Sequence, residues 1–79
     1  MNIKIYSTPT CPYCVKVKEY LDGKGIVYEN FDVSRDRIKA DEMVMKSSQR
    51  GVPVLDIDGV IVIGFDRPRI DSILGLQSH

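Results

Sequence analysis

The stretch IKIYSTPTCPYC, residues 3–14, decides the fold, because a strand-like pattern gives way there to a helix-like one. Ile3 and Ile5 alternate with less apolar neighbours, and this period of two is typical of a strand with one buried face. A loop that contains proline interrupts the alternation, since proline disfavours helical geometry in the residue before it. We expect a helix to begin near Cys11 or Pro12, because a proline in the first helical turn sacrifices no hydrogen bond.

The pattern downstream of this stretch predicts the remaining elements. In the first helix, Cys14, Val17 and Leu21 recur at helical spacing and form a stripe that is expected to be buried. Gly23 and Gly25 end that helix. A strand is predicted over 26–33, followed by a helix that Ser34 or Asp36 caps, that passes Ile38, Met43 and Val44, and that ends near Ser48. Two further strands are predicted over 54–57 and 60–63, joined by an Asp58-Gly59 turn. The last predicted helix is capped by Asp66 and has Pro68 in its first turn, and its apolar face consists of Ile70, Ile73 and Leu74.

The predicted order of elements is β-α-β-α-β-β-α, which indicates an α/β fold built on one four-stranded mixed sheet flanked by helices. The chain has 79 residues and shows no internal repeat and no linker-like segment. We therefore expect a single domain over residues 1–79. A chain of this length buries only about 60% of the surface of its unfolded state, so its core of Ile, Val, Leu and Met must be compact.

Composition and charge argue against several classes of function. Eleven basic residues balance eleven acidic ones and no block of like charge stands out, which gives no support to binding of nucleic acid or of a membrane surface. No segment approaches the roughly 20 apolar residues that span a bilayer. The first residues lack the apolar core of a signal peptide, so a cytoplasmic location is predicted.

The chain's only two cysteines, Cys11 and Cys14, lie at the predicted start of the first helix. In a reducing cytosol such a pair is expected to be redox-active, because a disulfide across so short a loop restrains the unfolded chain very little. Cys11 is expected to be exposed at or just before the start of the helix. The N–H groups at a helix N-terminus lower the pKa of a thiol placed there, so Cys11 is expected to be the attacking thiolate. Cys14, on the apolar stripe, is expected to resolve the mixed disulfide. Pro12 is predicted to stiffen the turn, and Tyr13 to be an exposed ring that covers a bound sulfur or peptide.

Two cysteines at this spacing also occur as half of a zinc site, which needs four ligands. Beyond the cysteines the chain offers one histidine, His79, at its C-terminal end. We therefore expect no metal site within one chain, although a module that binds zinc, copper or an iron–sulfur cluster stays an alternative. A catalytic cysteine–histidine pair is not expected, because no well-placed histidine exists.

The pair Val52-Pro53 is the second informative feature, because proline fits the start of a central strand poorly. Either the strand simply begins at this proline, or the peptide bond before it is cis. A cis bond would leave the backbone groups of Val52 unpaired, and such an edge can pair with an extended substrate that contains a thiol.

Together these residues make the chain resemble the glutaredoxin family of the thioredoxin superfamily. The resemblance rests on Cys-Pro-Tyr-Cys at 11–14, on Val52-Pro53, and on Gly64-Phe65-Asp66 before the last helix, and it extends over nearly the whole chain. It implies a thioredoxin fold, a cis bond before Pro53, and disulfide reduction through a mixed disulfide at Cys11. We expect a monomer that holds no bound cofactor and uses glutathione as its reducing co-substrate.

The resemblance also implies a binding site for glutathione or a substrate, and the chain departs from the family pattern within it. The expected binding residues are Tyr13, Gly51, Val52, Pro53, Gly64, Phe65, Asp66 and Arg67. Thr8 stands where glutaredoxins commonly have a lysine, and Gly51 stands where they usually have a threonine. Arg67 replaces an aspartate that meets the ammonium group of glutathione, so it reverses the charge at that point. Glutathione is therefore expected to bind more weakly than in other glutaredoxins, or to bind in a different orientation.

The run from Gly64 to Pro68 is similar to the Ser-Gly-Phe-Arg-Pro stretch of NrdH-type redoxins. Those proteins resemble glutaredoxins, but thioredoxin reductase reduces them and they supply electrons to ribonucleotide reductase. The leading hypothesis is an enzyme, a dithiol oxidoreductase that reduces protein disulfides or glutathione mixed disulfides through Cys11 and Cys14. The alternative is an NrdH-type electron donor whose reductant is thioredoxin reductase.

Overall fold

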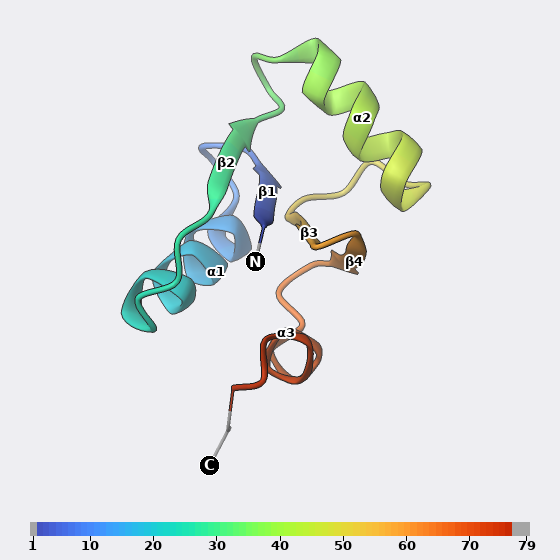
Figure 1. Cartoon of the computed structure of the whole chain (residues 1–79). Helices are drawn as coiled ribbons and strands as arrows, with labels where there is room; N and C mark the ends of the chain where they lie inside the picture. The colour runs from blue at the N-terminus through green and yellow to red at the C-terminus, as the bar shows by residue number, and fades with distance from the viewer. Residues whose placement is uncertain (1, 77–79) are drawn as a thin grey trace.

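The computed structural model describes residues 2–76 and contains all of the predicted elements in the predicted order (Figure 1). The strands are β1 (Ile3–Ser7), β2 (Glu29–Asp32), β3 (Val54–Ile57) and β4 (Val60–Ile63), and the helices are α1 (Pro12–Gly23), α2 (Arg37–Ser47) and α3 (Arg67–Leu74). His79, the one histidine considered as a metal ligand, lies outside the described residues.

One sheet of four strands, in the order β2-β1-β3-β4, forms the centre of the fold. Strand β1 runs parallel to β2 and antiparallel to β3, and β4 returns antiparallel to β3, so the sheet is mixed as predicted. Asp58 and Gly59 make the turn between β3 and β4 with positive φ angles of 49° and 91°, which suits the expected hairpin turn. Helices α1 and α3 cover one face of the sheet and α2 covers the other (Figure 1).

The alternation of side chains along β1 supplies one wall of each of two cores. Ile3 and Ile5 face α1 and α3 and pack against the predicted stripe of α1. Tyr6 faces the other way and packs with Met43 of α2. Because β1 leads directly into the loop before α1, the strand that contributes to both cores also fixes the position of the cysteines.

The second strand is shorter than predicted. The sequence pattern indicates a strand over 26–33, but β2 contains only Glu29–Asp32. The N–H of Ile26 bonds to the carbonyl oxygen of Leu21 at 3.0 Å, so this residue is held against the end of α1 and does not pair in the sheet. Val27 is 86% exposed, because the pairing of β2 with β1 begins only at Glu29.

A charged cluster ties α2 to the sheet, and the apolar pattern of the sequence does not reveal it. The Nζ of Lys46 lies 2.7 Å from Oδ2 of Asp56 on β3 and 3.1 Å from Oε1 of Glu42. It also donates a hydrogen bond of 2.9 Å to the hydroxyl of Tyr6. The other carboxylate oxygen of Asp56 accepts a 2.8 Å hydrogen bond from the N–H of Gly59, so Asp56 also holds the β3–β4 turn. Burial alone would lower the pKa of Lys46, but its hydrogen bonds outweigh burial and raise that pKa.

The cluster makes the free energy of unfolding depend on pH in the acidic range. Hydrogen bonds from Lys39, at 3.0 Å, and from Lys46 hold the pKa of Glu42 down to about 2. Because this value lies below the ordinary 4.5, Glu42 stabilises the fold above pH 4.5, and its contribution is lost as the pH falls toward 2. We expect the urea midpoint to fall between about pH 5 and pH 3, and to fall less in Glu42→Gln. An equal fall in both proteins would contradict this role.

Candidate dithiol site

Cys11 is the N-cap of α1, and its own side chain takes part in the capping. Its Sγ accepts a hydrogen bond from the N–H of Cys14 at 3.2 Å, so a donor at the helix N-terminus points at this sulfur. As a thiol, Cys11 also donates to the carbonyl oxygen of Val52 across 3.8 Å. The sequence predicts an exposed Cys11, whereas the residue is half-buried, because the backbone at Val52 covers one side of the sulfur.

Cys14 lies one helical turn further along α1 and is fully buried. Burial raises the pKa of its thiol to about 11, and the neighbouring sulfur of Cys11 adds to the shift. A thiol with such a pKa stays protonated at neutral pH. The two sulfurs therefore differ, since Cys14 is neutral and shielded while Cys11 is accessible to another molecule.

The two residues between the cysteines occupy the positions that the sequence predicts. Pro12 is the first residue of α1. Tyr13 is 61% exposed, and the Nζ of Lys16 lies 5.1 Å from the centre of its ring, within range of a cation–π interaction. The ring of Tyr13 is therefore an accessible aromatic surface close to Cys11 in the chain.

The start of β3 and the loop before α3 meet beside Cys11. The Val52–Pro53 peptide bond is cis, as the resemblance to glutaredoxins implies. The carbonyl oxygen of the buried Pro53 accepts a hydrogen bond of 2.8 Å from the N–H of Gly64. Together with the contact between Cys11 and Val52, this bond brings three separate parts of the chain to one site.

The other residues predicted to bind a ligand are also held by contacts within the fold. Gly51 is exposed, and its N–H bonds to a glutamine side chain two residues earlier, at 2.7 Å. Phe65 packs against Tyr20 of α1 with the ring centres 5.7 Å apart. Asp66 caps α3, and its carboxylate accepts an N–H of the first turn at 3.3 Å. The loop 64–66 is therefore held between β3, α1 and the start of α3.

Arg67 contacts Tyr20 of α1 and Asp71 of α3, and neither residue is in the site predicted from the sequence. Its guanidinium carbon lies 4.8 Å from the ring centre of Tyr20, and its Nε lies 3.8 Å from Oδ2 of Asp71. A signal for this arrangement was present in the sequence, because Asp71 follows Arg67 by one helical turn and stands beside the apolar Ile70. Charges on the apolar face of a helix usually have a partner.

The part of the chain that the structure describes gives no support to a resident metal. Among residues 2–76, no group of three or more His, Cys, Asp or Glu side chains is arranged to hold a metal ion. Within the same range, no helix combines the length and the apolar content that crossing a bilayer requires.

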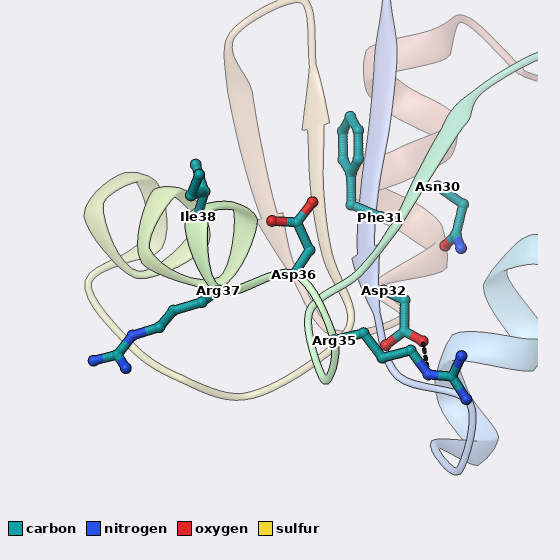
Figure 2. Close-up of a pocket in the computed structure, with 7 residues that line it drawn as sticks. All are labelled: Asn30, Phe31, Asp32, Arg35, Asp36, Arg37 and Ile38. Carbon is teal, nitrogen blue, oxygen red and sulfur yellow. Dashed lines mark ion pairs between the residues drawn. The ribbon is translucent and has the colours of Figure 1, made fainter.

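An open hollow of about 580 Å³ lies at the end of β2, and it shares no residue with the predicted site. Its lining residues are Asn30, Phe31, Asp32, Arg35, Asp36, Arg37 and Ile38 (Figure 2). Its two carboxylates serve the local fold, since Asp32 pairs with Arg35 at 3.9 Å and Asp36 caps α2. Figure 2 shows Arg37 extending away from Asp36. We therefore assign no ligand to this hollow.

Comparison with known proteins identifies relatives along nearly the whole chain. The glutaredoxin family profile matches residues 3–62. A relative from Clostridium pasteurianum, described as an uncharacterized glutaredoxin-like 8.6 kDa protein in a rubredoxin operon, is 50% identical over 72 residues. That match covers 91% of this chain and 96% of the relative.

Solved structures agree with the fold. The crystal structure of a thioredoxin-like protein matches with a TM-score of 0.91 and 33% identity, over 96% of this chain and 97% of that chain. The NrdH-redoxin of Escherichia coli matches with a TM-score of 0.79 and 28% identity, over 100% of this chain and 99% of that chain. The protein therefore has a thioredoxin fold and belongs to the glutaredoxin family of thiol–disulfide oxidoreductases.

Proposed function

We propose that this protein is a dithiol oxidoreductase that reduces protein disulfides or glutathione mixed disulfides. The observation that carries the proposal is the asymmetry of the cysteine pair. The Sγ of Cys11 accepts the N–H of Cys14 at 3.2 Å, while Cys14 itself is fully buried. An N–H aimed at a sulfur stabilises the negative charge of a thiolate, which is the nucleophile in thiol–disulfide exchange.

The proposed reaction transfers two electrons from the dithiol to the substrate. The thiolate of Cys11 attacks one sulfur of the substrate disulfide, which forms a mixed disulfide and releases the other half as a thiolate. Cys14 then loses its proton and attacks the Sγ of Cys11, and the proton leaves with the departing thiol. The protein now carries a Cys11–Cys14 disulfide, and a reductant must return the two electrons.

The surroundings of Cys11 support a binding surface for a thiol compound. Tyr13 offers an exposed ring, and Val52 offers backbone groups next to the sulfur. The loop 64–66 is held beside them by the bond from Gly64 to Pro53. We assign substrate contact to these groups, and we propose glutathione as the reducing co-substrate.

A second candidate is an NrdH-type electron donor that thioredoxin reductase reduces. Similarity to the NrdH-redoxin of Escherichia coli supports it, because that glutaredoxin-like protein is described as having a thioredoxin-like activity profile. Arg67 supports it too, since a positive charge there opposes the ammonium group of glutathione.

The two candidates predict different reductants. We expect the oxidised protein to be reduced faster by glutathione with glutathione reductase than by thioredoxin reductase, when NADPH consumption is followed at matched protein concentrations. Faster reduction by thioredoxin reductase would favour the NrdH-type donor and contradict glutathione as co-substrate. Reduction by neither system would count against both candidates.

A further inference from the structure

A buried carboxylate joins α1 to α3 beside the proposed site. The side chain of Asp71 is only 5% exposed. One of its oxygens accepts a hydrogen bond from the hydroxyl of Tyr20. Within residues 2–76, the other oxygen, Oδ2, has no hydrogen-bond partner, and the Nε of Arg67 lies 3.8 Å from it. A buried carboxylate is costly unless its charge is compensated, so Arg67 is the compensating group.

The same contacts hold Arg67 in one place. Its guanidinium lies 4.8 Å from the ring centre of Tyr20, at cation–π distance, and its side chain is 53% exposed. The hydrogen bond to Asp71 raises the pKa of Tyr20, so the phenol stays protonated and keeps donating. Arg67 is thus held by two contacts, one with the ring of Tyr20 and one with the carboxylate of Asp71.

A chain of contacts connects Arg67 to the reactive sulfur. The carbonyl oxygen of Val52 lies 3.8 Å from the Sγ of Cys11, and the next residue bonds to Gly64. The loop from Gly64 continues through Phe65, which packs on Tyr20, and reaches Arg67 two residues later. Arg67 is also one of the residues that the resemblance to glutaredoxins implies for the binding site, so we assign its charge to the edge of that site.

We propose that Asp71 and Tyr20 are positioning residues that compensate and fix the charge of Arg67, so that the site admits a thiol compound carrying an ammonium group. This inference rests on the proposed function. An uncompensated guanidinium would repel an ammonium at this edge of the site. A carboxylate 3.8 Å away turns the single charge into a dipole, whose field falls off faster with distance. Asp71 thereby offsets the charge reversal that Arg67 introduces.

The test compares two substrates on one variant, Asp71→Asn, which keeps the size of the side chain. The first substrate is a mixed disulfide between glutathione and a cysteine-containing peptide, and the second is the same compound with the glutathione amine acetylated. We expect the ratio of kcat/KM for the free amine to that for the acetylated amine to fall about threefold, through KM. Because both rates come from one preparation, a partly unfolded variant lowers both and leaves the ratio unchanged.

Two further variants separate charge compensation from a merely structural role. Tyr20→Phe removes the hydroxyl and is expected to change the ratio in the same direction, by less. In an Arg67→Gln background, the change from Asp71 to Asn is expected to leave the ratio unaltered, because no guanidinium remains to be compensated.

The outcomes distinguish this inference from the proposed function. The proposed role of Asp71 is overturned if Asp71→Asn leaves the ratio of kcat/KM for the free and acetylated amines unchanged. It is also overturned if Asp71→Asn changes this ratio equally in the Arg67→Gln background. In both cases the protein still reduces both disulfides, so the proposed function stands. Failure of the unmodified protein to reduce either disulfide overturns the proposed function itself.

Discussion

Replacing Cys11 by serine is expected to lower the disulfide-reductase rate by at least about a thousandfold, because a serine hydroxyl does not ionise near neutral pH as a thiol does. Serine can still accept the N–H of Cys14, so the start of α1 is expected to keep its cap. The rate of reduction of a disulfide-containing protein, followed with a chemical reductant that supplies electrons in excess, measures the loss. A Cys11→Ser protein that keeps its reductase rate would contradict the assignment of the nucleophile.

The matched control is Cys14→Ser, which removes the second sulfur and leaves the first exchange intact. This variant is expected to accumulate a stable mixed disulfide at Cys11 with a protein substrate, detectable as an added mass that a strong reductant removes. It is expected to retain activity on glutathione mixed disulfides, because a second thiol from solution can release the product. Equal loss in both variants on both substrates would mean that the two sulfurs are not divided into nucleophile and resolving thiol.

Replacing Lys46 by methionine is expected to lower the free energy of unfolding by about 2–3 kcal/mol. The change removes the cation that lies 2.7 Å from Asp56, whose side chain is only 12% exposed, and leaves that carboxylate without its counter-ion. Removing one partner of a buried ion pair typically costs about 3–5 kcal/mol, and the 27% exposure of Lys46 reduces this by solvent screening. Urea unfolding followed by far-UV circular dichroism measures the change.

Lys39→Met is the matched control, because Lys39 lies on the same helix and its side chain has a similar exposure of 29%. It pairs only with Glu42 among the carboxylates of the cluster, at 3.0 Å. We expect a loss below about 1 kcal/mol, as for a single exposed pair. Similar losses in the two variants would show that the contact with Asp56 adds nothing beyond an ordinary surface ion pair.

The fold could be predicted largely because local signals and burial agree. The alternation of apolar residues in β1, the apolar stripe on α1 and the Asp58-Gly59 turn each indicate a single local structure. The predicted strand over 26–33 was too long for a related reason. Apolar and β-branched residues indicate a strand, but an edge strand extends only as far as its neighbour pairs with it, and that register is not a local property of the sequence.

The site could be predicted in part, since its central motif is contiguous in the chain. Cys11 and Cys14 have the predicted places at the start of α1, one at the cap and one buried. The half-burial of Cys11 could not be predicted, because Val52 comes from a distant segment. Tyr20, one of the two partners of Arg67, was missed for the same reason, since it lies 47 positions earlier in the sequence. A single sequence identifies a charged residue but not the side chain that folds against it.

The Sγ of Cys11, the nucleophile in the proposed reaction, also accepts the N–H of Cys14 and so caps the first turn of α1. A sulfur in a mixed disulfide carries less negative charge than a thiolate, so it accepts a hydrogen bond from an N–H less well. Loss of a helix cap lowers the free energy of unfolding by about 1 kcal/mol. Turnover and folding are therefore thermodynamically linked in this small protein. We therefore expect the proposed mixed disulfide to be less stable to unfolding than the dithiol, and we expect release of the bound partner from Cys11 to be favoured by the return of that helix cap.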